Sequence, residues 1–107
     1  MNYLDEIAIQ IRLATPTDVI PKGDVMALFR MYGVLLLAKG VQVNSEDVHN
    51  AWVAWMLAKN SGHPALNPFS ELPPEKSKLD SIYVSAIHEV ATLRERELHS
   101  KGGLEKL

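Results

Sequence analysis

The stretch that decides the fold is residues 44–59, NSEDVHNAWVAWMLAK, which opens with a helix-start signal and continues with helical periodicity. Asn44 is a favourable N-cap, and Asp47, three residues later, completes the reciprocal pattern of a capping box. Val43 and Val48 occupy the two positions of a hydrophobic staple around that cap. We therefore predict a helix over this stretch, ended by the Asn-Ser-Gly sequence that follows it.

Three more helices are predicted on either side of this one. Residues 2–14 place apolar side chains at helical spacing behind an asparagine cap. Residues 24–39 form a helix that is apolar nearly all round, which is typical of a helix at the centre of a core or covered by a second subunit. Gly33 in its middle predicts the close approach of another helix. The last helix begins between residues 74 and 80 and carries an apolar stripe at spacings of three and four.

We predict an all-α fold, in which a small helical domain has four main helices and a structured proline-rich loop between the third and the fourth. Residues 1–100 form this single domain, because 107 residues suffice for one hydrophobic core and not for two. Residues 101–107, which include Gly102-Gly103, are expected to form a flexible C-terminal tail.

The composition excludes several classes of function. The formal net charge of −2 argues against a nucleic-acid partner, which would require a basic face. The absence of cysteine excludes thiol catalysis and thiolate metal sites and is compatible with a reducing cytoplasm. The most apolar run, residues 32–38, is too short to span a membrane, and the N-terminus is acidic where a signal peptide would be basic. We therefore expect a cytoplasmic protein without membrane contact.

The residues that could bind a ligand concentrate in the third helix and in the loop after it. The predicted ligand-binding residues are His49, Trp52, Trp55, Lys59, His63 and Lys76. Indole faces can stack a base, while lysine and histidine can contact phosphate or hydroxyl groups. The alternative is that tryptophans at helical spacing belong to the core, and that Lys59 only favours the helix dipole.

Catalysis and metal binding have little support in the sequence. Four histidines are present, but none pairs with another at the spacing of a helical metal motif. No Gly-x-Ser-x-Gly sequence and no glycine-rich phosphate loop occurs. We predict no catalytic residues, no metal and no cofactor. His88 on the last helix is expected to face solvent.

A series of residues stands in a recognisable order over 44–80: His49, Trp52, His63, Pro64, Leu66, Pro68, Phe69, Leu72, Pro73, Lys76 and Asp80. This order resembles the RyR domain, the repeat module of ryanodine receptors that also occurs alone in bacterial and phage proteins. The segment between the third helix and the His-Pro sequence is shorter than in that family. The chain is also similar to short uncharacterised proteins of actinobacteria and their phages.

The resemblance implies a non-catalytic binding module that senses or sequesters an adenine-type nucleotide or a nucleotide-derived signal in a phage or host setting. The alternative is a protein–protein interaction module, either a homo-oligomer such as a dimer or a binder of a host protein, with no small-molecule ligand. This alternative follows from the nearly uniform apolar character of residues 24–39.

Overall fold

The computed structural model describes residues 2–59, 68–71 and 74–105, and the regular secondary structure within these ranges is helical. The α-helices are α1 (Tyr3–Ala14), α2 (Met26–Lys39), α3 (Ser45–Leu57) and α4 (Pro74–Glu105). Three 3-10 turns lie in the connections: η1 (Thr17–Val19), η2 (Gly40–Gln42) and η3 (Phe69–Glu71). The predicted all-α class with four main helices is confirmed. Of the proline-rich loop, residues 60–67 and 72–73 lie outside the described ranges.

Helices α1 and α2 pack closely, and Gly33 lies where they approach each other. A Cβ atom built on Gly33 would lie 3.0 Å from Leu4 Cδ1 and 3.5 Å from Ile7 Cγ2. The predicted close approach of a helix at this glycine is therefore confirmed. One hydrophobic core joins buried side chains from all four α-helices, including Ile7, Phe29, Trp55 and Ile87.

The predicted start of α3 is confirmed in detail. Asn44 Oδ1 accepts the backbone N–H of Asp47 at 2.9 Å, and Asp47 Oδ2 accepts the N–H of Asn44 at 3.0 Å, so the capping box is complete. Lys39 at the end of α2 also donates to Asp47 Oδ2 at 2.8 Å, and this hydrogen bond lowers the pKa of Asp47. The end of α2 is thus tied to the start of α3. Helix α3 ends at Leu57, two residues before the predicted end.

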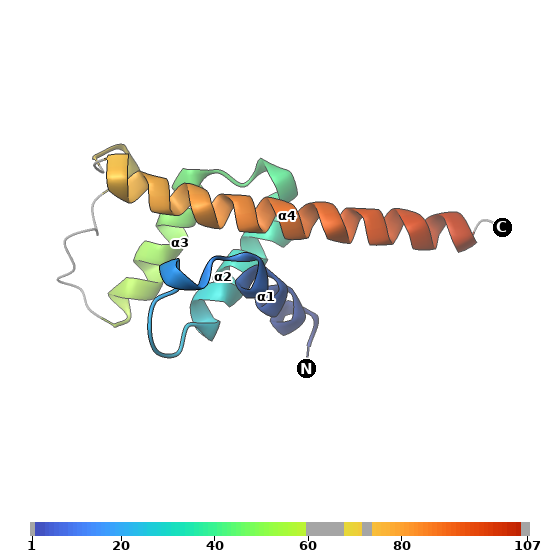
Figure 1. Ribbon diagram of the computed structural model, residues 1–107, viewed down its shortest axis with the longest axis horizontal. Coiled ribbons are helices and arrows are strands. Elements are labelled where there is room, and N and C mark those ends of the chain that lie inside the picture. Colours follow the sequence, from blue (N-terminus) through green and yellow to red (C-terminus); the bar gives the residue numbers. More distant parts are fainter. Residues whose placement is uncertain (1, 60–67, 72–73, 106–107) are drawn as a thin grey trace.

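Helix α4 runs along the long axis of a molecule measuring 56 × 28 × 23 Å (Figure 1). Its 32 residues correspond to about 48 Å of helix, and its C-terminal end projects beyond the other elements (Figure 1). The buried side chains of α4 in the described part all precede residue 92. The backbone is helical through Glu105, where a tail was expected, while the flexibility of residues 101–107 stays a prediction. We call residues 93–105 the arm and the rest of the fold the body.

Helix α2 is less enclosed than its composition predicts. Leu28, Phe29, Tyr32 and Leu36 face the core, whereas Val34 and Leu37 are exposed on the other side. Some of the apolar side chains that surround this helix therefore lie at the surface. Among the described helices, none combines the length and the apolar character that crossing a bilayer would require.

Candidate functional site

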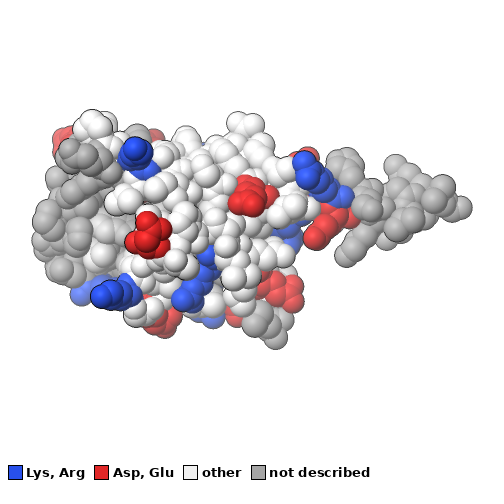
Figure 2. All heavy atoms as spheres, viewed as in Figure 1, with Lys and Arg blue, Asp and Glu red and all other residues white. Residues whose placement is uncertain are grey.

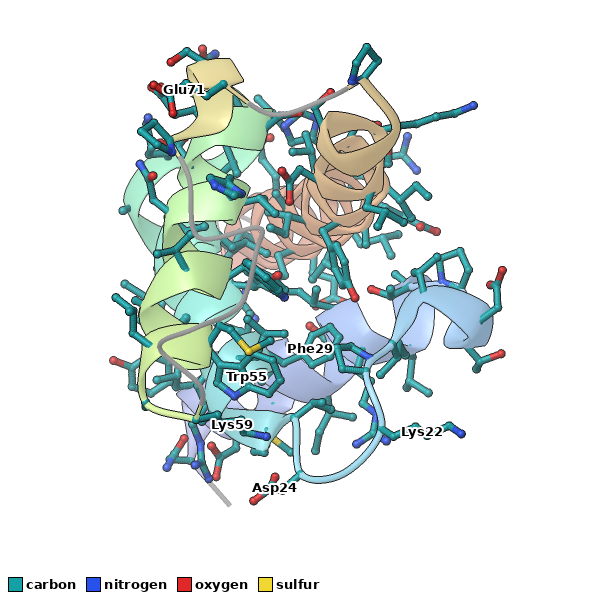
Figure 3. The ribbon with its side chains drawn as sticks, turned by 90° about the vertical axis from the view of Figure 1, so that its left-hand side faces the viewer. Lys22, Asp24, Phe29, Trp55, Lys59 and Glu71 are labelled. Carbon is teal, nitrogen blue, oxygen red and sulfur yellow. The ribbon has the colours of Figure 1, made fainter. Side chains whose placement is uncertain are left out.

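Trp55 and Lys59 meet at the C-terminal end of α3, one helical turn apart (Figure 3). Trp55 is only 5% exposed and belongs to the core. Lys59 Nζ lies 4.1 Å from the centroid of the Trp55 ring and donates a hydrogen bond to the backbone carbonyl oxygen of Asp24 at 3.3 Å. This cation–π contact and hydrogen bond hold the ammonium group over the indole. The ring face covered by Lys59 is therefore occupied in this structure.

His49 and Asp80 form a buried pair between α3 and α4. The two side chains belong to residues that are 2% and 7% exposed, and His49 Nδ1 lies 3.5 Å from Asp80 Oδ2. Burial raises the pKa of Asp80 to about 6, although the neighbouring His49 partly lowers it. Desolvation disfavours a carboxylate that has few hydrogen-bond donors around it, which explains the direction of the shift.

Two tyrosines extend this pair into the core. The rings of Tyr32 and Tyr83 lie 5.2 Å apart between centroids, and Tyr83 donates its hydroxyl hydrogen to the backbone carbonyl of Val19. The hydroxyl of Tyr32 and Oδ2 of Asp80 are buried and have no hydrogen-bond partner among the described residues. Burial raises the pKa of Tyr32, and raises that of Tyr83 to about 12, with the charge of Asp80 adding to both shifts.

Of the two tryptophans, Trp52 is the less enclosed. It is half-buried, and its ring stacks on that of His49 with 6.2 Å between centroids and 22° between planes. The structure thus arranges four predicted site residues as two pairs, His49 with Trp52 and Trp55 with Lys59.

The other two predicted site residues cannot be placed beside these pairs. His63 lies outside the described residues, and so does the side chain of Lys76, whose backbone belongs to α4. The ligand-binding assignment of the six residues therefore stays a prediction. Within the described part of the chain, no three histidine, aspartate or glutamate side chains converge as a metal site would require.

Sequence reasoning missed Asp80 as the carboxylate neighbour of a histidine. It falls three and seven residues before Tyr83 and Ile87, which are both buried, so helical spacing places it on the same stripe. This position on the buried stripe was the signal from which the burial of Asp80 could have been predicted. Helix α4 begins at Pro74, within the range of 74–80 that the sequence predicted.

The expectation that His88 faces solvent is wrong. His88 is half-buried, and its Nε2 lies 2.7 Å from the backbone carbonyl oxygen of Val43. A carbonyl only accepts hydrogen bonds, so Nε2 carries the proton and donates it. This bond links the middle of α4 to the residue before the α3 cap, and sequence spacing alone gives no sign of it.

Two grooves flank α4 where it leaves the body. A groove of about 290 Å³ lies between α4 and the end of α1, and one of about 380 Å³ lies between α4 and the end of α2. Arg94 lines both grooves. Five exposed aliphatic side chains also line them, and we call these the apolar rim: Leu13, Leu37, Val41, Leu93 and Leu98.

Comparison with known proteins identifies a family. No curated protein and no solved structure matches the chain significantly. The resemblance to the RyR domain is not tested by these comparisons and stays a prediction. A family model described as a domain of unknown function, DUF7701, matches residues 2–92, which include α1, α2, α3 and the part of α4 that packs on the body. The chain therefore belongs to the DUF7701 family.

Proposed function

We propose that this chain is a non-catalytic protein–protein interaction module whose contact surface is the apolar rim. The observation that carries the proposal is the position of the rim around the base of a projecting helix. Leu13 is 81% exposed and Leu98 is 66% exposed, and each lines a groove. Single exposed leucines are ordinary, whereas apolar side chains that gather along grooves are typical of binding surfaces.

The energetics favour a partner at this place. Burying a leucine side chain is worth about 1.5–3 kcal/mol, so covering several rim residues offers a substantial driving force. The arm is also a helix that extends away from the body, and an isolated helix of fewer than about 12–15 residues is marginally stable in water. A partner that lies along the arm would therefore stabilise the helix as well as cover the rim.

The test is site-specific photo-crosslinking in cells that naturally produce the protein. A photoreactive phenylalanine analogue replaces Leu13 in one variant and Leu98 in another. The matched control carries the same analogue at Leu57, which is 53% exposed at the end of α3 and lies outside the rim. We expect crosslinked protein adducts from both rim positions and none from the control position.

The outcomes separate the possible partners. An adduct of twice the chain mass would identify a second copy, and an adduct of another mass would identify a different protein. Equal crosslinking at Leu57 and at the rim, or none at either rim position, would overturn the proposal. The cytoplasmic location and the absence of a nucleic-acid partner stay predictions from composition.

A nucleotide-type ligand is the second candidate, and the stacked pair of Trp52 and His49 is the observation that favours it. Trp52 keeps part of its surface exposed and lies on the helix that leads into the proline-rich loop. An aromatic ring in that position can stack a base.

This second candidate is tested by tryptophan fluorescence during titration with linear and cyclic adenine nucleotides. A ligand at Trp52 should give a saturable change that survives Trp55→Phe and disappears in Trp52→Phe. A flat response of the unmodified chain to every compound would remove this candidate and leave the interaction module.

A further inference from the structure

The face by which α4 packs on the body continues into the arm. Tyr83, Ile87 and Val90 are buried, and residues three or four positions further along share the same face of a helix. Arg94, which is half-buried, and Glu97, which is exposed, occupy that continuation. Among the described residues neither takes part in an ion pair. The arm therefore presents two unpaired opposite charges on the face that would receive a partner.

The sequence of the arm base is complementary to itself. Residues 93–98 read LREREL, so two antiparallel copies place Leu93 level with Leu98 and Arg94 level with Glu97 of the second copy. Glu95 and Arg96 lie on the other side of the helix, so Arg94 and Glu97 carry the charge match. A two-fold symmetric interface requires a surface that complements itself, because the same patch is contributed by both copies. This segment meets that requirement in both charge and apolar character.

Grooves lie on both sides of this segment. Leu93 and Glu97 line the groove beside α1, and Leu98 lines the groove beside α2. Figure 2 shows acidic and basic groups side by side where α4 leaves the body. Two helices commonly cross at an angle with the ridges of one in the grooves of the other. A crossing arm can then continue along a groove and cover rim residues of the opposite body.

We propose that the partner of the apolar rim is a second copy of this chain, and that the two arms cross in antiparallel orientation near residues 95 and 96. Arg94 of each copy pairs with Glu97 of the other, and the leucines on either side exclude water from these pairs. This inference rests on the proposed function, because it names the partner of the same surface.

The test is the mass of the full-length chain in solution, measured by light scattering and sedimentation. The protein concentration is raised from below about 1 μM to about 100 μM, a range that reveals a micromolar dissociation constant. The monomer mass is 11.9 kDa, and we expect a concentration-dependent approach to twice that value. A monomer throughout the range would overturn self-association. It would leave the interaction module intact if the rim still crosslinks to a different protein in cells.

Two charge reversals test the antiparallel crossing. Arg94→Glu and Glu97→Arg each create like charges across the two-fold axis, so each should raise the dimer dissociation constant by at least about tenfold. An equimolar mixture of the two variants should recover the dimer, because every acidic position then meets a basic position of the other copy. Loss of a charge pair within one chain could not be repaired by mixing.

Two further variants complete the assignment. Leu13→Glu should weaken the dimer by at least about tenfold, because the new charge would lose its hydration when the second copy covers the groove beside α1. Leu57→Glu, at an exposed leucine outside the rim, should leave the dimer unchanged. Circular dichroism of each variant serves as the control for unchanged helix content. A dimer that is insensitive to the rim and charge variants, or a mixture that fails to recover, would overturn the proposed interface.

Discussion

Replacing Asp80 with asparagine keeps the size of the side chain and removes its charge, so the substitution isolates the cost of ionising a carboxyl group in the core. Asp80 is 7% exposed, and its Oδ2 accepts no hydrogen bond within the described part of the structure. Burial raises its pKa from 3.8 to about 6. The native state therefore holds this proton more tightly than the unfolded chain does.

The sign of the pH dependence follows from linkage. Below pH 3.8 the carboxyl is neutral in both states and adds no penalty. Between that pH and about 6 the native state binds more protons, so the stability of the unmodified protein falls as pH rises. A shift of roughly two pKa units corresponds to about 3 kcal/mol at neutral pH. The Asp80→Asn variant has no carboxyl group to ionise at this position. Its free energy of unfolding should therefore rise by about 3 kcal/mol relative to that of the unmodified protein between pH 4 and pH 7.5.

Urea unfolding monitored by tryptophan fluorescence gives the two stability curves directly. The same comparison in a His49→Gln background should give a larger difference, because His49 partly lowers the pKa of Asp80. Parallel curves, within about half a kcal/mol, would refute the desolvation argument. A difference of the opposite sign would show that Asp80 and His49 form a stabilising ion pair in the native state.

Three smaller perturbations test the local structure by urea unfolding. Asn44→Ala removes the acceptor of the capping box and should lower the unfolding free energy by about 1 kcal/mol, whereas Asn44→Ser should retain most of it. Gly33→Leu should cost about 1–3 kcal/mol by forcing α1 and α2 apart, while Gly33→Ala should stay within about 1 kcal/mol because the half-buried Leu4 can move aside. Lys59→Ala should cost about 0.5–1 kcal/mol and shift the emission of Trp55 towards longer wavelength; unchanged emission would contradict the observed cation–π contact.

The features that depend on residues close in sequence could be predicted from the sequence. The cap of α3 is an interaction between residues three apart. Gly33 is a poor helix former in the middle of a helix, and this indicated the close contact of α1 and α2. The length of α4 could not be predicted, because Gly102-Gly103 and the charged run before it are typical of a helix end. Helix propensity does not require that a helix be covered along its whole length.

The candidate site was less predictable because it depends on tertiary contacts. Helical spacing placed both tryptophans on one helix, but it could not show that Trp55 belongs to the core. It also could not predict that Lys59 contacts the backbone carbonyl of Asp24, 35 residues away in the sequence. The same limit applies to His49, whose carboxylate neighbour, Asp80, lies on another helix. The exposed rim depends on the lengths of three helices, and residue patterns within any one of them do not reveal it.

The part of α4 that precedes the arm stabilises the fold, whereas the arm carries the proposed contact surface. The part before the arm contributes buried side chains, among them Asp80 with its raised pKa. A buried group of this kind affects the stability of the fold and is not accessible to a partner. The arm contributes no buried side chain among those that the structure describes, yet it keeps charges and leucines in a self-complementary order. A change in Asp80 should therefore alter unfolding without altering dimer affinity at a pH where the protein is fully folded. A change in Arg94 should alter affinity without altering the unfolding of the monomer. If both measurements changed with both residues, the body and the arm would have to be treated as one coupled unit.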